Sequence, residues 1–224
     1  MTTIDADLRP RLVVDVWSDI MCPFCYMGDA LLAQALERFP HAASVDVRYH
    51  SYQLMPHLPA DHAVNVNELL VREKGFPRAQ AEAMNAQIAS RGKELGLDYQ
   101  FDRALAVNTR AAHRLSHFAK REGKQRALML RLFRAFFTEG LHLGRHEVLA
   151  DLAADVGLAR TAAEGALANG AFEEEVKVDE QQARELAISG VPFFVLDGTY
   201  AISGAQSVGA FRKALETAWT NRSR

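Results

Sequence analysis

Two short hydrophobic runs near the start of the chain predict strands on either side of a helix. Residues 11–17 (RLVVDVW) form a β-branched run, which is typical of a buried strand. Hydrophobic residues then recur at helical spacing over residues 23–39, and Pro40 ends that pattern. Residues 44–54 alternate hydrophobic and polar side chains, which predicts a second strand with one buried face. The chain therefore opens with a predicted β-α-β unit.

A long block of helix-forming segments, separated by glycines, begins near residue 65 and contains no strand pattern. Its expected helices cover residues 65–74, 77–95, 108–121, 125–139, 145–156 and 160–169. Strand character returns at residues 191–203, where two hydrophobic runs flank Asp197-Gly198, a strong hairpin signal. A last amphipathic helix is expected over residues 207–219.

This order of elements predicts an α/β protein that carries an inserted helical subdomain. Without the helical block, the chain reads as β-α-β, then a helix, a strand hairpin and a final helix. We assign residues 11–60 and 172–224 to the part that contains the sheet, and residues 61–171 to the insertion. No fixed-period repeat or low-complexity linker separates the two parts.

Composition and charge narrow the classes of function. The 224 residues are 49% hydrophobic and 24% charged, which is ordinary for a globular protein. The net charge of -2 predicts no broad basic surface for nucleic acid or anionic membranes. The N-terminus lacks the pattern of a secretory signal, and no hydrophobic run reaches the ~20 residues of a membrane span. We therefore expect a cytoplasmic protein, in which a lone cysteine pair is more often catalytic or metal-binding than structural.

The two cysteines, Cys22 and Cys25, lie at the predicted strand-to-helix junction. Unpaired N–H groups and the dipole of a helix N-terminus stabilise a thiolate, and Pro23 suits the first helical position. Cysteines three residues apart share a helix face, so Cys25 can attack a mixed disulfide formed on Cys22. This arrangement predicts Cys22 as the attacking nucleophile and Cys25 as a buried resolving thiol.

A metal site is the alternative for such a pair, and it needs two further ligands. Because the chain has no third cysteine, histidines would have to supply them, and His113/His117 and His142/His146 are each spaced four residues apart. Both pairs lie far along the chain, and Gly144 indicates a helix break within the second. We interpret these histidines as core or exposed side chains and predict no metal.

The sequence WSDIMCPFCYMG after a strand, together with SGVPFF before a hairpin, resembles the thioredoxin fold and specifically the DsbA-like FrnE family of dithiol-disulfide oxidoreductases. The similarity extends to residues 108–114 in the insertion and 203–206 near the end. It implies a thioredoxin-like domain with a large helical insertion, and exchange of disulfides with protein or low-molecular-weight thiols. Apart from a redox-active Cys22-Cys25 disulfide no cofactor is implied, although glutathione or thioredoxin could act as a redox partner.

The resemblance also implies which residues surround the dithiol. Val191-Pro192 is expected to be a cis peptide that faces Cys22, and the residues expected to contact substrate are Pro23, Phe24, Val191 and Pro192. The main chain of Val191 could pair with an extended substrate peptide. Phe24 adds no charge between the cysteines, which argues against a very strong oxidant.

Two acids near the dithiol have candidate roles. Asp15 is either the buried carboxylate that helps to move the proton of Cys25 or a solvent-facing strand residue. Asp19 is expected to cap the helix, where its negative charge would raise the pKa of Cys22.

Two other functions are compatible with this architecture. The glutathione-dependent 2-hydroxychromene-2-carboxylate isomerases and kappa-class glutathione transferases share it, and Asn108 resembles a residue at the start of their inserted helix. Their site, however, has a serine where this chain has Cys22. The third reading is a non-catalytic peptide-binding chaperone whose cleft is lined by Phe133, Phe136 and Phe137, although such a stripe is more often core.

Overall fold

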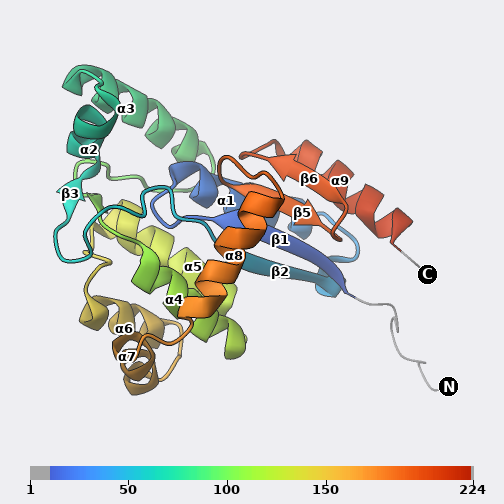
Figure 1. Cartoon of the computed structure of the whole chain (residues 1–224). Helices are drawn as coiled ribbons and strands as arrows, with labels where there is room; N and C mark the ends of the chain where they lie inside the picture. Colours follow the sequence, from blue (N-terminus) through green and yellow to red (C-terminus); the bar gives the residue numbers. More distant parts are fainter. Residues whose placement is uncertain (1–10, 223–224) are drawn as a thin grey trace.

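The computed structural model describes residues 11–222, which form a mixed sheet with helices on both faces (Figure 1). Most of the N-terminal segment considered above as a secretory signal lies outside this range. Residues 223–224, assigned above to the thioredoxin-like domain, also lie outside it. Within the described range, no helix is both long enough and apolar enough to cross a membrane.

The sheet has the strand order β2-β1-β5-β6. Its strands are β1 (Leu12–Ser18), β2 (Val45–Ser51), β5 (Phe193–Leu196) and β6 (Tyr200–Ser203). β1 runs parallel to β2 and antiparallel to β5, with Val14 opposite Val47 on one side and Leu196 on the other. The predicted β-α-β opening and the C-terminal hairpin are therefore confirmed, and the hairpin brings β5 next to β1.

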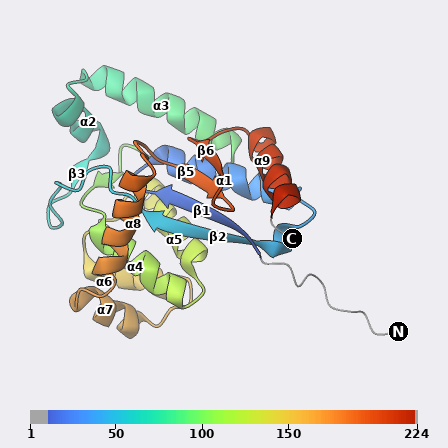
Figure 2. The same ribbon diagram turned by 45° about the vertical axis from the view of Figure 1, so that its right-hand side comes forward.

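Helices cover the two faces of this sheet differently (Figure 2). α1 (Pro23–Glu37) and α9 (Val208–Asn221) pack together on one face, where Phe194 and Phe211 meet edge to face. α8 (Glu173–Glu185) crosses the other face (Figures 1 and 2). There Trp17 packs with Ala183 and Ile188 in a second, smaller hydrophobic cluster.

The predicted helical block is confirmed. It contains α2 (Val66–Lys74), α3 (Arg78–Glu94), α4 (Arg110–Arg121), α5 (Gln125–Arg134), a π-helical turn (Ala135–Glu139), α6 (His146–Asp155) and α7 (Arg160–Ala168). α2 and α3 form an arm that projects from one end of the molecule, whereas α4 and α5 lie beside β2 and α6 and α7 pack against them (Figures 1 and 2). A short ladder of β3 (Val64–Asn65) with β4 (Leu105–Ala106) interrupts the block. The expectation of no strand there was wrong, because two-residue strands leave no hydrophobic period.

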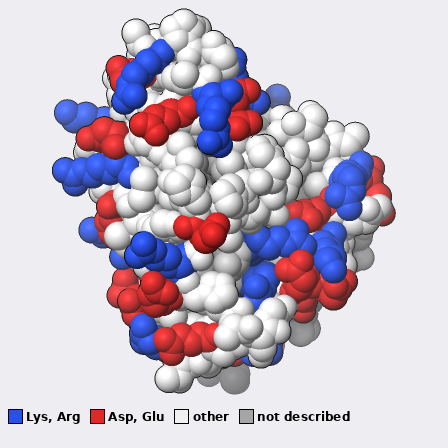
Figure 3. All heavy atoms as spheres, turned by 60° about the vertical axis from the view of Figure 1, so that its left-hand side comes forward, with Lys and Arg blue, Asp and Glu red and all other residues white. Residues whose placement is uncertain are grey.

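Several side chains for which the sequence left more than one role open belong to the core. Phe133 and Phe136 are fully buried and Phe137 is 1% exposed, so these rings fill the interior and do not line a cleft. His113 and His117 are buried on α4. The predicted helix break at Gly144 is confirmed, because α6 begins only at His146. Figure 3 shows acidic and basic side chains interspersed on the face drawn, with an uncharged area across its middle, consistent with the small net charge.

Candidate functional site

The two cysteines lie where β1 leads into α1, as the sequence predicts. Cys22 directly precedes the helix with an extended backbone, and Pro23 occupies the first helical position. The Cys22 carbonyl accepts hydrogen bonds from the N–H groups of Cys25 and Tyr26, at 3.0 and 3.4 Å. Cys22 therefore lies at the unpaired N–H groups and the positive dipole end of α1.

The Cys22 thiol faces the segment that leads into β5. Its sulfur donates a hydrogen bond to the main-chain oxygen of Val191, with a sulfur–oxygen distance of 3.4 Å. The Val191-Pro192 peptide bond is cis, which confirms the conformation implied by the resemblance. Cys25 is 3% exposed, as expected for a resolving thiol, and Cys22 is almost equally enclosed at 4%. Little of the Cys22 surface is therefore open to solvent.

Gly28 allows α1 to pass close to this segment. A Cβ atom at position 28 would lie 3.0 Å from both Pro192 Cγ and Phe194 Cζ, which is closer than carbon atoms normally pack. The glycine of the CPFCYMG motif thus sets the separation between the helix and β5. Through that separation, it also sets the position of Cys22 relative to Val191.

The surroundings of Cys25 hold its thiol in the protonated form. Burial raises the pKa of Cys25 well above its usual value, and the hydrogen bond and charge of Cys22 raise it further. The Ser18 hydroxyl and the main chain of Asp19 act in the opposite direction and lower this pKa. Because the thiolate is the nucleophilic form of a cysteine, Cys25 has to lose its proton before it can attack another sulfur.

Tyr99, which follows α3 in the chain, reaches the dithiol turn. Its hydroxyl donates a hydrogen bond to the Pro23 carbonyl at 2.7 Å, and its ring is stacked on Phe101. Burial, then the nearby Tyr26 and the two cysteines, raise the pKa of Tyr99, so the hydroxyl stays a donor. No sequence pattern indicates this contact, since residues 23 and 99 are brought together only by the tertiary fold.

Phe24 is the exposed residue of the dithiol turn. It is 37% exposed, which is unusual for a large aromatic side chain beside two buried sulfurs. The guanidinium of Arg91 on α3 lies 6.0 Å from the centre of its ring. Phe24 is thus available to a substrate on the side of the α2–α3 arm, and its predicted role in substrate contact stays a prediction.

The carboxylate of Asp15 is 2.7 Å from Nε2 of His50 on the neighbouring strand. Its side chain is 24% exposed, whereas Val14 and Val16 on either side are buried. The β1 side chain that lowers the pKa of Cys25 is Ser18. A proton-transfer role for Asp15 stays a prediction.

Asp19 does not cap α1, so the expected capping role was wrong. Cys22 occupies the N-cap position, and no side chain caps the helix. The Asp19 carboxylate is fully buried and accepts a hydrogen bond from the Leu54 N–H at 2.7 Å. Its other oxygen lies 3.3 Å from Nε2 of His113 on α4. The acid thus ties the dithiol turn to the loop after β2 and to the insertion.

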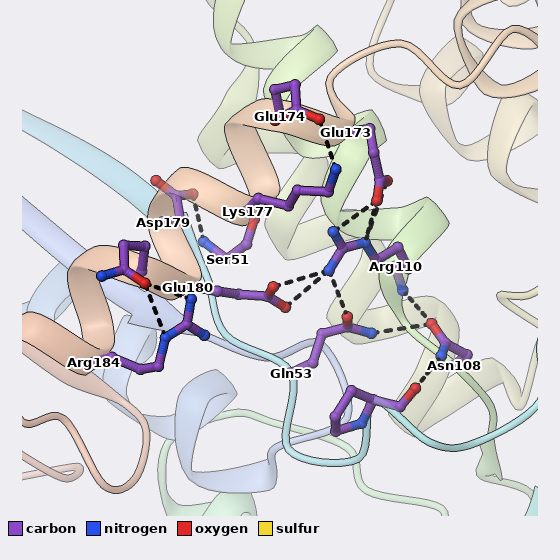
Figure 4. Close-up of polar contacts among 12 residues, drawn as sticks. Ser51, Gln53, Asn108, Arg110, Glu173, Glu174, Lys177, Asp179, Glu180 and Arg184 are labelled. Atoms are coloured by element: carbon purple, nitrogen blue, oxygen red, sulfur yellow. Dashed lines mark hydrogen bonds and ion pairs between the residues drawn. The ribbon is translucent and has the colours of Figure 1, made fainter.

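Two further polar clusters connect α8 to β2 and α4 (Figure 4). Asp179 accepts hydrogen bonds from the Ser51 N–H and from His50, both at 2.7 Å, and lies 2.9 Å from His117. Arg110 forms ion pairs with Glu173 and Glu180, at 2.7 and 2.9 Å. These contacts fix α8 against β2 and α4, and sequence reasoning did not find them because their partners lie more than 60 residues apart.

Asn108 is occupied by structural hydrogen bonds. Its amide N–H groups donate to the carbonyls of Pro56 and Leu58, at 2.8 and 2.9 Å. Its side-chain oxygen accepts from Gln53 and from the Arg110 N–H, at 3.0 and 2.9 Å (Figure 4). The residue that resembles the isomerase family therefore anchors the loop after β2 to the start of α4.

A family model and solved structures of other proteins agree with the fold described above. The family model of the DSBA-like thioredoxin domain matches residues 13–216. The crystal structure of a probable DsbA oxidoreductase from Streptomyces coelicolor is 36% identical, covers 96% of this chain and 92% of its own, and has a TM-score of 0.90. The uncharacterized protein YwbO of Bacillus subtilis is 29% identical over 90% of this chain and 94% of its own length. The cytosolic disulfide reductase DsbM of Pseudomonas aeruginosa, solved with GSH, shares the fold at 20% identity, with a TM-score of 0.66 over 93% of this chain and 99% of its own.

The sheet, the helical insertion and the CxxC pair at the start of α1 define a thioredoxin-fold protein of the DsbA type. With a family model that spans nearly its whole length, the chain belongs to the DSBA-like thioredoxin domain family.

Proposed function

We propose that this protein is a thiol–disulfide oxidoreductase that uses Cys22 and Cys25 as a redox-active dithiol. The observation that carries the proposal is the position of Cys22. Its sulfur lies at the start of α1, within hydrogen-bond distance of the Val191 carbonyl, and its thiol is free, as is that of Cys25. A helix N-terminus lowers the cost of forming the thiolate, and the main chain of Val191 offers an edge for an extended substrate.

The reaction takes place in two exchanges. The Cys22 thiolate attacks one sulfur of a substrate disulfide RS–SR′, forms a mixed disulfide Cys22–S–S–R and releases R′S⁻. Cys25 then loses its proton and attacks the Cys22 sulfur, which forms the Cys22-Cys25 disulfide and releases RS⁻. Two electrons pass from the dithiol to the substrate, and the two thiolates take up the two protons. Oxidation of a substrate dithiol is the same sequence in reverse.

The first test is turnover of a peptide that contains one disulfide, with dithiothreitol as reductant. The wild type is expected to reduce it catalytically, and Cys22→Ser to lose all turnover. In a reaction without dithiothreitol, Cys25→Ser is expected to stop after a single exchange, because no second thiol is then present to resolve the mixed disulfide. Wild-type turnover by Cys22→Ser would overturn the proposal.

The same variants separate the other two functions. A glutathione-dependent isomerase has a serine at the position of Cys22 and no use for Cys25. Cys22→Ser would therefore retain isomerase activity towards 2-hydroxychromene-2-carboxylate. A peptide-binding chaperone would suppress aggregation of a denatured protein equally well without either thiol. The buried Phe133, Phe136 and Phe137 give the chaperone reading no cleft.

The direction of exchange and the partner are part of the proposal. We infer exchange with protein or low-molecular-weight thiols in the cytoplasm, with glutathione or thioredoxin as the recycling thiol. The uncharged Phe24 between the cysteines favours a reducing dithiol over a strong oxidant. A reduction potential near about -270 mV would support a reductase, and one near about -120 mV an oxidase.

A further inference from the structure

Ser18, the last residue of β1, carries a buried hydroxyl that the proposed exchange does not yet use. The residue is 1% exposed, and within residues 11–222 its hydroxyl has no hydrogen-bond partner. A buried hydroxyl without a partner costs free energy, so its position calls for another explanation. The Ser18 side chain is a neighbour of Cys25, because it is among the groups that lower the pKa of the Cys25 thiol.

Ser51, on the neighbouring strand, is a buried serine whose hydroxyl does have a partner. Ser18 and Ser51 are paired in register between β1 and β2, and Ser51 is 2% exposed. The Ser51 hydroxyl is 3.1 Å from Nε2 of His117. The two paired serines thus have different neighbours: Ser51 lies beside the imidazole of His117, and Ser18 lies beside Cys25.

Cys25 needs a donor of this kind only while it is a thiolate. A neutral thiol is a weak hydrogen-bond acceptor, whereas a thiolate accepts strongly. The titratable groups around the dithiol are Cys22 directly before α1, Tyr26 on α1, Asp19 after β1, Tyr99 after α3 and His113 on α4. Tyr99 already donates to Pro23, and the Asp19 carboxylate is an acceptor held by Leu54. Of these neighbours, Tyr99 and Asp19 already have hydrogen-bond partners. The Ser18 hydroxyl is a donor near Cys25 that has none.

We propose that Ser18 is a positioning residue for the resolving step, and that its hydroxyl donates a hydrogen bond to the Cys25 sulfur as that sulfur becomes a thiolate. The inference rests on the proposed thiol–disulfide exchange. In the step concerned, the Cys25 S–H bond breaks, a sulfur–sulfur bond to Cys22 forms, and the bond from Cys22 to the substrate sulfur breaks. The departing RS⁻ takes up a proton, so Cys22–S–S–R and Cys25–SH become Cys22–S–S–Cys25 and RSH.

Ellman's reagent separates the two exchanges, because each one releases a coloured thiolate. In a stopped-flow reaction of the reduced protein with one equivalent of the reagent, the first release reports attack by Cys22 and the second reports resolution by Cys25. For Ser18→Ala we expect an unchanged first release and a second release slowed about tenfold, as one hydrogen bond to a charged group predicts. The pH midpoint of the second release should move upward. Ser18→Thr keeps the hydroxyl and should stay close to wild type.

Ser51→Ala is the matched control, since it removes a buried hydroxyl at the same level of the sheet. It should leave the second release unchanged. The inference fails if Ser18→Ala resolves at the wild-type rate and pH midpoint, or if Ser51→Ala slows resolution equally. The proposed function fails separately if the wild type gives no second release at all.

A measurement without turnover tests the same contact. In the Cys22→Ser background, the rate of alkylation of Cys25 by iodoacetamide follows its thiolate fraction as the pH is varied. Adding Ser18→Ala should move the midpoint of this curve to higher pH, whereas adding Ser51→Ala should not. An unmoved midpoint with Ser18→Ala would overturn the inference even if the substitution altered the stability of the protein.

Discussion

Gly92→Ala should loosen the contact between the insertion and the dithiol turn. A Cβ atom at Gly92 on α3 would lie 2.2 Å from Cε2 and 2.4 Å from Cδ2 of Tyr99. Carbon atoms pack at roughly 3.5 Å, so the Tyr99 ring has to move by about 1.3 Å. That movement pulls its hydroxyl away from the Pro23 carbonyl, 2.7 Å away in the native protein.

The expected loss of stability is the balance of three terms. Overpacking costs about 1–3 kcal/mol, and the lost hydrogen bond about 0.5–1.5 kcal/mol. Replacement of a helical glycine by alanine returns about 0.8–1 kcal/mol. We therefore expect Gly92→Ala to lower the free energy of unfolding by about 2 kcal/mol.

Gly165→Ala is the matched control, because Gly165 is exposed on α7 and a Cβ there would meet nothing within 4 Å. Its free energy of unfolding should rise by about 0.8–1 kcal/mol, the gain from replacing a helical glycine by alanine. Urea unfolding at pH 7 measures the free energy of unfolding of both variants. In thermal melts, their melting temperatures should differ by roughly 6–12 °C. Tyr99→Phe isolates the hydroxyl and should lose only about 0.5–1.5 kcal/mol. If Gly92→Ala proved as stable as Gly165→Ala, the close approach of Tyr99 to α3 would be refuted.

Three further outcomes follow from the same contacts. Gly28→Ala, which would bring a Cβ to 3.0 Å from two ring carbons, should slow disulfide reduction. Gly209→Ala, whose nearest neighbour is 3.8 Å away, should not slow it. Asp179→Asn should lower the free energy of unfolding by about 3 kcal/mol, because it removes a buried charge from its partners. Stability from the His50–Asp179 pair should be greatest between about pH 4 and pH 6.5, which thermal melts across pH would show.

The sign of this pH dependence follows from the two pKa shifts. Burial works to lower the pKa of His50, but hydrogen bonds to Asp15 and Asp179 outweigh it and raise that pKa. Its contribution is therefore complete below the unfolded value of about 6.5 and disappears as the pH rises through the raised value. Burial works to raise the pKa of Asp179, but its hydrogen bonds to His117 and His50 lower it. Its contribution is present above about pH 4 and disappears as the pH falls. The pH profile of His50→Gln should be flatter on the alkaline side, and an unchanged profile would contradict the assignment.

Local patterns predicted the elements of the fold well. The hydrophobic runs of β1 and β2, Pro40 after α1 and the glycines between helices are all short-range signals. The hairpin between β5 and β6 follows in the same way from Asp197-Gly198, both of which have positive φ angles. Such signals act within a few residues of the chain, so they are legible before the fold is known.

The contacts around the dithiol could be predicted only in part. The CxxC pair and the cis-proline segment are recognisable because each is a short motif with its own chemistry. Asp19 was misread as a helix cap, because its partners Leu54 and His113 are distant in the sequence. Tyr99 gave no signal for the same reason, since its partner Pro23 is 76 residues away. No local pattern marks the Ser18 hydroxyl as buried and without a partner. What the sequence could not supply was the set of groups that surround each sulfur, which only tertiary packing brings together.

Trapping of the mixed disulfide shows directly which cysteine attacks and which one resolves. Cys25→Ser and Cys22→Ser are each mixed with a disulfide-containing peptide, and intact mass followed by peptide mapping locates any adduct. We predict a stable adduct on Cys22 in Cys25→Ser and no adduct in Cys22→Ser, since Cys22 attacks and Cys25 resolves. An adduct on Cys25 in Cys22→Ser, with none on Cys22 in Cys25→Ser, would contradict this prediction.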